Sequence, residues 1–257
     1  MKILLIGDIV GNSGVKKVKD VIPQYKKDNN IDYIIANGEN SADGMGITKR
    51  IFEDLKNAGV NIVTMGNHTW GKRDIFAFLD DNQIIRPANY PKGVPGAGYR
   101  IHEINGKKIA IINLIGRVDT GVLAENPFLK ADDIIEKIKD KADIIVVDFH
   151  AEATAEKIAM GYYLDGRVSC IFGTHTHVQT ADEKILEKGT AYITDIGMTG
   201  PEKSVIGMDV EASLKRFVTT LPERYKVSED TNVILTGCIL EIDDEKCRIE
   251  KINRIKL

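Results

Sequence analysis

Eight polar side chains that can bind metal ions or transfer protons follow short apolar segments of this chain. They are Asp8, Glu39, Asn40, Asn67, His68, His150, His175 and His177. Four of the five histidines of the chain belong to this set. Ligands of open α/β sheets bind outside the carboxyl ends of the strands, where all eight would lie if the apolar segments are strands. The pattern predicts one polar site built from several strand ends.

The donor atoms of this set are imidazole nitrogens, carboxylate oxygens and amide oxygens. His175 and His177 are two residues apart, so their side chains would point the same way from an extended segment. Taken alone, Asp8 could be a turn or cap residue and Asn67 a left-handed turn residue. Taken together, the donors match what two divalent metals sharing a bridging carboxylate require. We therefore expect a metal centre with nitrogen and oxygen ligands.

Continuous apolar runs predict the strands that must position this site, since such runs are typical of strands buried on both faces. The runs are Lys2–Ile6, Tyr33–Ala36, Asn61–Met65, Lys108–Leu114, Asp143–Val147 and Val168–Phe172. Amphipathic stretches at helical spacing lie between them. These stretches are Val15–Lys27, Lys49–Asn57, Arg73–Asp80 and Ala131–Asp140. The alternation of strands and helices predicts an α/β fold.

The last third of the chain is predicted to be richer in strands. Its expected strands are Thr190–Thr194, Leu214–Thr219, Asn232–Ile242 and Cys247–Ile255. Strands without crossovers favour antiparallel hairpins, and Asp243-Asp244-Glu245 would form the last turn. A mixed sheet, or a second sheet packed on the first, follows. The densest Gly/Pro segment, Pro87–Gly98, is predicted to be a loop, and no linker divides the chain, so we expect one domain over residues 1–257.

The composition limits which binding partners and which cellular compartment we expect for this protein. The 257 residues carry 35 Lys plus Arg against 38 Asp plus Glu, a net charge of −3, which provides no basic field for duplex nucleic acid. The N-terminus has only four consecutive apolar residues, Ile3–Ile6, too few for a signal peptide or a spanning helix. Cys170, Cys238 and Cys247 show no CxxC spacing. We expect a cytoplasmic protein with no membrane association and no duplex nucleic acid partner.

The motifs around these donors resemble those of the calcineurin-like metallophosphoesterase superfamily. Three segments resemble its YmdB-type phosphodiesterase branch more closely: Asp148–Thr154, Gly173–Thr180 and Asp195–Pro201. The likeness runs from Lys2 to about Met208. The superfamily usually has His where this chain has Val10, and Asp where it has Glu39, and the YmdB-type branch shares both departures. The resemblance implies two mixed β-sheets packed face to face and flanked by helices, an α/β/β/α sandwich.

The resemblance also implies an activity, the hydrolysis of 2′,3′-cyclic nucleotides to 3′-nucleotides, and a role for each donor. Glu39 would bridge two metal ions, Asp8, Asn40 and His177 would hold one of them, and Asn67, His150 and His175 would hold the other. The metals would be iron or manganese, with zinc as an alternative. A hydroxide bridging the metals would attack phosphorus in line, and His68 would protonate the departing 2′-oxygen. The alternative for His68 is a residue that only orients Asn67.

Residues outside the donor set are candidates for binding substrate or for supporting the donors. Candidate substrate contacts are Asn12, Ser13, Asn89, Tyr90 and the Gly197–Pro201 turn. Thr174 and Thr176 would steady the ligand loop through hydrogen bonds. Trp70 fits a core residue better than a base-stacking one, and His102 lies in an alternating segment that predicts a surface position.

Two other functions are less consistent with the residues. Gly7–Gly14 has the spacing GxxxGxxG, not GxGxxG, and Asp8 would repel the pyrophosphate of a dinucleotide. A metal-stabilised regulatory or nucleotide-sensing scaffold would have no need of His68. A homo-oligomer is expected only from the resemblance.

Overall fold

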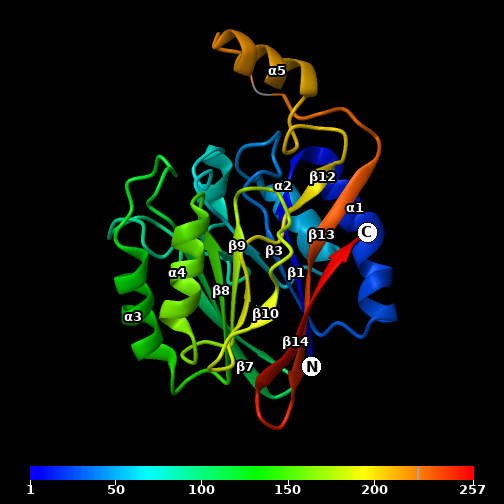
Figure 1. Ribbon diagram of the computed structural model, residues 1–257. Coiled ribbons are helices and arrows are strands. Elements are labelled where there is room, and N and C mark those ends of the chain that lie inside the picture. The colour runs from blue at the N-terminus through cyan, green and yellow to red at the C-terminus, as the bar shows by residue number, and fades with distance from the viewer. Residues whose placement is uncertain (225) are drawn as a thin grey trace.

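The apolar runs form strands of two sheets that pack face to face (Figure 1). The computed structural model describes residues 1–224 and 226–257. The first sheet has the order β2-β12-β13-β1-β3-β4-β5, with β14 beside β13. Its strands are β1 (Lys2–Ile6), β2 (Asp8–Ile9), β3 (Tyr33–Asn37), β4 (Ile62–Thr64), β5 (Ile84–Ile85), β12 (Met198–Pro201), β13 (Val233–Asp243) and β14 (Arg248–Lys256).

The second sheet has the order β10-β11-β9-β8-β7-β6. Its strands are β6 (Tyr99–Ile104), β7 (Lys107–Ile115), β8 (Ile144–His150), β9 (Cys170–Thr174), β10 (Lys184–Ile185) and β11 (Ala191–Ile193). Within it β7, β8, β9 and β11 are parallel, as β1, β3, β4 and β5 are in the first sheet. The carboxyl ends of both parallel sets lie at one edge of the molecule, because Thr64 at the end of β4 bonds Asp148 near the end of β8.

Most of the helices cover the outer face of one of the two sheets. The helices are α1 (Gly11–Asp28), α2 (Lys49–Asn57), α3 (Pro127–Ile138), α4 (Thr154–Leu164) and α5 (Val210–Thr219), with a 3-10 helix η1 (Arg73–Ala77). Residues of α1 and α2 pack in one buried cluster with the first sheet, and residues of α3 and α4 in another with the second sheet. A third cluster, including Leu5, Ile111 and Phe172, fills the space between the sheets. This arrangement confirms the expected α/β/β/α sandwich.

Most predicted elements are confirmed with small shifts of their ends, including α2, the hairpin turn at Asp243 and the Pro87–Gly98 loop. Strand β8 runs three residues further than predicted, to His150, because Asp148 is satisfied inside the sheet. The helix predicted over Arg73–Asp80 is only the short 3-10 helix η1. It ends where Phe78 leaves the helical region, with φ of −141° and ψ of 3°, and packs into the core.

Two further predictions are wrong. Leu214–Thr219 is part of helix α5 and not a strand. Its apolar residues are spaced three and four apart, and the side chain of Asp209 caps the helix by accepting a hydrogen bond from the amide of Ala212. The second error concerns His102, which is half-buried and not a surface residue. Its ring lies between the hydroxyl of Tyr33 and the carbonyl of Asn82.

Candidate metal centre

Asp8 is placed by the tight junction between β1 and β2. A side chain at Gly7 would come within 2.2 Å of the carbonyl oxygen of Gly197, so only glycine fits there. Asp8 follows it with a fully buried carboxylate, and its Oδ2 accepts a hydrogen bond of 3.1 Å from the amide of His175. The bond joins a residue of the first sheet to the loop that follows β9 in the second sheet.

Glu39 lies at the centre of the donor set, in the loop after β3. The side chain of Asn37 accepts a hydrogen bond from the amide of Glu39 and fixes this turn. One carboxylate oxygen of Glu39 accepts a 2.8 Å bond from the amide of His68, and the other lies 3.2 Å from Nε2 of His150. Asn40 reaches the same carboxylate through its Nδ2 at 3.1 Å. Because the Glu39 side chain is only 1% exposed, its charge needs cationic partners.

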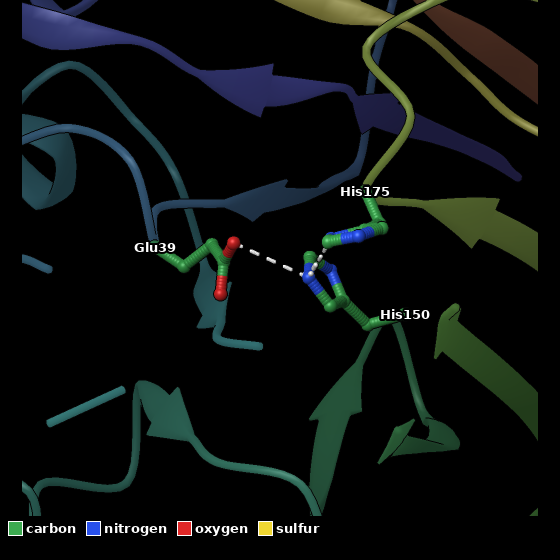
Figure 2. Close-up of side chains that lie close together, drawn as sticks. All are labelled: Glu39, His150 and His175. Atoms are coloured by element: carbon green, nitrogen blue, oxygen red, sulfur yellow. Dashed lines mark hydrogen bonds and ion pairs between the residues drawn. The ribbon is translucent and has the colours of Figure 1, made fainter. Parts of the chain in front are cut away.

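Asn67, His150 and His175 converge on Glu39 from three different strand ends. Nε2 of His150 is 2.8 Å from Oδ1 of Asn67 and 3.0 Å from Nδ1 of His175. Donor atoms of Glu39, His150 and His175 all lie within 4.8 Å of one another. Figure 2 shows the carboxylate and the two rings pointing toward a common centre. A carboxylate and two imidazoles at this spacing can hold a metal ion.

A buried hydrogen-bond chain fixes the orientation of His150. The hydroxyl of Thr174 donates to Oδ1 of Asp148 at 2.7 Å, so its oxygen accepts from Nδ1 of His150 at 2.9 Å. The other oxygen of Asp148 accepts a bond from the hydroxyl of Thr64. Burial raises the pKa of Asp148 to about 6, although the charge of His150 and the two hydroxyls oppose this rise. With Nδ1 occupied, Nε2 of His150 faces Glu39, Asn67 and His175.

The other two histidines are oriented by different partners. Nε2 of His175 lies 3.1 Å from the carboxylate of Glu152, which leaves Nδ1 directed at Glu39 and His150. Nδ1 of His177 bonds the carbonyl oxygen of Ile206 at 2.8 Å, so Nε2 faces the site. That nitrogen is 3.1 Å from Nδ2 of Asn40 and 3.7 Å from a carboxylate oxygen of Asp8. Each ring thus presents one nitrogen inward.

The loop after β9 differs from the extended segment expected from the sequence. Strand β9 ends at Thr174, and His175 and His177 have φ of 101° and 64°. In this left-handed conformation the two rings reach different parts of the donor set, His175 toward His150 and His177 toward Asp8 and Asn40. The two imidazoles therefore do not share one face, and each lies in a different half of the donor set.

The electrostatics of the site favour a bound cation. Burial raises the pKa of Asp8. Burial alone would also raise the pKa of Glu39, but the charge and hydrogen bond of His150, together with His68, lower it to about 2. Burial lowers the pKa of His150, and the carboxylates of Glu39, Asp8 and Asp148 outweigh it and raise that pKa to about 9. The buried carboxylates thus retain a proton on His150, which a metal cation would replace.

The donor set fits transition metals that take nitrogen and oxygen ligands. Burial and the positive charge of His150 lower the pKa of His175 to about 3, so its ring is neutral and offers a lone pair. The donors are three imidazoles, two carboxylates and two amides, with no thiol among them. This composition matches Fe, Mn or Zn better than Mg²⁺ or Ca²⁺.

His68 lies at the exposed rim of the donor set. Its side chain is 33% exposed, and Nδ1 is 2.8 Å from Oδ1 of Asn40. The neighbouring Trp70 is half-buried against the core of the first sheet and stacks on Tyr90 and Phe76, which agrees with its predicted core position. Of the four candidate histidines, His68 has the most exposed side chain, and it also contacts a donor residue.

The candidate substrate contacts are mostly engaged by the protein itself. Asn89 is fully buried and bonds backbone groups of Ile115 and Glu125, and the hydroxyl of Tyr90 bonds the carbonyl of Gly66. The predicted turn at Gly197–Pro201 is wrong, because Met198–Pro201 is strand β12 and pairs with β13 and β2. Asn12 is exposed at the start of α1, and the Ser13 hydroxyl is buried with no hydrogen-bond partner.

Sequence reasoning gave no role to several residues that support the donors. Asp148, Lys157 and Asp195 are buried charged residues, and Glu152 orients His175. Asp148 lies inside an apolar strand, and Lys157 lies on the buried face of α4. A charged residue at a position where the hydrophobic pattern expects an apolar one was the available signal.

The chain is similar in sequence and in structure to several known proteins. The chain is 50% identical over 256 residues to the 2′,3′-cyclic-nucleotide 2′-phosphodiesterase of Bacillus subtilis, covering 99% of this chain and 96% of that protein. A crystal structure of a novel phosphatase from Mycoplasma pneumoniae superposes with a TM-score of 0.94 at 38% identity, over 100% of this chain and 93% of that one. A hypothetical protein from Thermus thermophilus has the same TM-score and identity, over 100% and 99% of the chains.

The two-sheet sandwich and the similarity to these proteins define the class of the chain. It is a metallophosphoesterase, an enzyme of the phosphoesterase class. The model of the family described as YmdB-like protein matches residues 4–255. The chain belongs to this family.

Proposed function

We propose that this protein hydrolyses 2′,3′-cyclic nucleotides to 3′-nucleotides with two bound metal ions. The observation that carries the proposal is the shared position of Glu39, whose carboxylate lies within 3.2 Å of both Nδ2 of Asn40 and Nε2 of His150. A carboxylate between two donor groups is the arrangement that a dinuclear centre needs. The name of the Bacillus subtilis relative supports this substrate class.

The proposed ligands form two halves around Glu39. We call Asn67, His150 and His175 the His150 half, and Asp8, Asn40 and His177 the His177 half. Iron or manganese would occupy both halves, with zinc as the alternative. Such cations supply a water nucleophile of lowered pKa and neutralise charge on the phosphoryl oxygens. A rotation of the Asn40 amide by 180° would bring its oxygen toward the His177 half and its nitrogen toward His68.

His68 would act as the general acid. Its Nδ1 is held by the side chain of Asn40, which leaves Nε2 to carry a proton to the substrate. When the bond between phosphorus and the 2′-oxygen breaks, that oxygen takes the proton, and the phosphate stays on the 3′-oxygen. The backbone amide of His68 bonds Glu39, so the acid keeps a fixed position relative to the centre of the donor set. Such help in proton transfer contributes about 10²- to 10⁴-fold to the rate.

The test is a joint measurement of metal content and turnover. The purified chain, supplied with Mn²⁺ or Fe²⁺, is assayed on 2′,3′-cyclic AMP, 3′,5′-cyclic AMP and an aryl phosphodiester, and we expect hydrolysis of the first. His68→Ala should keep its metal and lose about 10²- to 10⁴-fold in kcat. His102→Ala is the matched control, because His102 lies in β6 and bonds Tyr33 at the start of β3, away from the carboxyl edge. A His68→Ala rate near that of the wild type would remove the general-acid assignment.

The second candidate is a regulatory or nucleotide-sensing scaffold with little turnover. The burial of most donors in a closed hydrogen-bond network is the observation that favours it, since such a network is stable without chemistry. A wild-type protein with both metals bound and no turnover on any of the three substrates would support the scaffold.

Further parts of the proposal concern partners and location. The substrate would be a small molecule and not duplex nucleic acid. Residues 1–257 would unfold as one domain, in a homo-oligomer whose contacts include α5. This helix projects from the body (Figure 1), with Phe217 and Val218 exposed by 76% and 80%. Light scattering on the wild type and on Phe217→Asp measures the oligomeric state.

Within the described residues no helix is long and apolar enough to cross a membrane. The free thiols of Cys170, Cys238 and Cys247 support a cytoplasmic location.

A further inference from the structure

The loop from Thr174 to His177 has a backbone that its own residues do not favour. His175 and His177 have φ of 101° and 64°, in the left-handed region that side chains other than glycine rarely adopt. This conformation sends the two rings into different halves of the donor set. Such a conformation persists only when the surrounding structure holds it.

A buried ion pair lies beneath this loop. Nζ of Lys157, on α4, is 2.7 Å from Oδ2 of Asp195, and the two side chains are 1% and 0% exposed. The same Nζ donates to the carbonyl of Thr174 at 2.8 Å. The same Oδ2 accepts from the amide and the hydroxyl of Thr176, at 3.1 Å and 2.8 Å. The ion pair therefore holds the backbone on both sides of His175.

Asp195 itself belongs to a firmly held segment. Its Oδ1 accepts from the amide of Gly197 at 2.8 Å, and its own amide donates to the hydroxyl of Thr180 at 3.0 Å. A side chain at Gly173 would come within 1.8 Å of the carbonyl oxygen of Thr194, so β9 lies directly against this segment. Both carboxylate oxygens of Asp195 are held by other partners, Gly197 and Lys157. The bonds from Thr176 to Asp195 therefore fix the position of the loop, and the position of Asp195 does not depend on the loop.

We propose that Lys157 and Asp195 are positioning residues for metal binding, which hold the Thr174–His177 loop in its left-handed form and so set the separation of the two histidine rings. Neither side chain touches the donor nitrogens of the rings; both act through the backbone and hydroxyl of the loop. The inference rests on the proposed role of His175 and His177 as ligands. A buried ion pair is not needed for stability alone, because an apolar pair of similar volume often serves equally well.

The test measures metal affinity in the absence of substrate, by competition with a chromophoric chelator. We expect Lys157→Met and Asp195→Asn to weaken the binding of Mn²⁺ by about 10- to 100-fold, as loss of residues that orient ligands does. Thr176→Val, which removes one hydroxyl, should weaken it less. Excess Mn²⁺ should restore kcat in each variant that folds. Lys56→Met is the matched control, because Lys56 lies on α2 and forms a partly exposed ion pair with Asp81, outside the donor set.

Folding is followed by circular dichroism and thermal melting of the same samples. If Lys157→Met does not fold, Asp195→Asn and Thr176→Val carry the test. Folded variants with a lowered melting temperature and unchanged Mn²⁺ affinity would overturn the proposal, since the pair would then serve stability only. A wild type that binds Mn²⁺ but turns over no cyclic nucleotide would contradict the proposed function and leave this affinity test intact.

Discussion

The two halves of the donor set orient their histidines in different ways. In the His150 half, the ring of His150 is fully buried and its Nδ1 is bonded to Thr174 and, through it, to Asp148. In the His177 half, the ring of His177 depends on one backbone carbonyl, that of Ile206. Ile206 is 48% exposed, has a φ of 49°, and lies in the loop that leads to α5. The ring of His150 is held by a buried network and the ring of His177 by a surface loop.

This difference has a consequence for metal affinity. A ligand whose orientation is fixed before binding loses less conformational freedom when the metal arrives, so the His150 half should bind more tightly. The donors of the His150 half are also closer together, at 2.8 Å and 3.0 Å from Nε2 of His150, whereas Nε2 of His177 is 3.1 Å from Asn40 and 3.7 Å from Asp8.

Loss of Glu39 should have the largest effect, because this residue is shared by both halves. We expect Glu39→Ala to bind neither metal and to lose about 10³-fold or more in kcat, since the metals supply several kcal/mol of transition-state stabilisation. Metal analysis and steady-state kinetics on the same sample measure both losses. A variant that keeps one metal would show that the halves bind independently and that Glu39 does not bridge.

Thr174→Val should separate the two halves. The substitution removes the hydroxyl between His150 and Asp148, so we expect about 10- to 100-fold weaker metal binding in the His150 half and little change in the other. Isothermal titration resolves the two binding steps. Equal weakening of both steps would mean that the buried network does not act on His150 in particular.

Stepwise removal of metal from the wild type compares the halves directly. With increasing chelator, we expect one equivalent to leave first, from the His177 half, at about a tenfold lower chelator concentration than the second. The order is assigned with His177→Ala, which should lack the first step only. If this variant lacks the tighter step, the ranking of the halves is wrong.

Ile206→Gly should have the smallest effect. Glycine keeps the carbonyl that bonds His177 and relieves the left-handed backbone, a relief of roughly 1–2 kcal/mol that the entropy of glycine partly offsets. We expect the free energy of unfolding to change by no more than about 1 kcal/mol, on the stabilising side, with unchanged metal binding. Urea denaturation measures it, and a loss of metal would show that the side chain of Ile206, not its carbonyl, orients His177.

The sequence was sufficient to predict the elements whose side chains are buried on both faces. The runs at Lys2–Ile6 and Val168–Phe172 predicted β1 and β9, and the polar residues after them were brought together because parallel strands end at one edge. The sequence wrongly predicts a strand in place of helix α5, because an apolar run normally indicates a buried element. Here Leu214, Phe217 and Val218 are apolar but exposed, so the run does not indicate burial.

The local geometry of the donors could not be predicted in the same way. The left-handed φ of His175 and His177 depends on Lys157 and Asp195. In the sequence these residues are 17 residues from Thr174 and 19 residues from Thr176, respectively, so they meet the loop only in the folded state. Likewise, the inward nitrogen of each ring is selected by partners from other elements, such as Glu152 and Ile206. Such contacts have no signature in hydrophobic periodicity.

The donors come from both layers of the sandwich. Asp8, Glu39, Asn40 and Asn67 follow strands of the first sheet, whereas His150, His175 and His177 follow strands of the second. Any cation held between them would therefore act as a cross-link between the two sheets at the edge where the parallel strands end. A ligand that binds only the folded state stabilises that state, by about 4 kcal/mol when the free ligand is at 1,000 times its Kd. A bound metal ion would therefore also raise the free energy of unfolding of this protein.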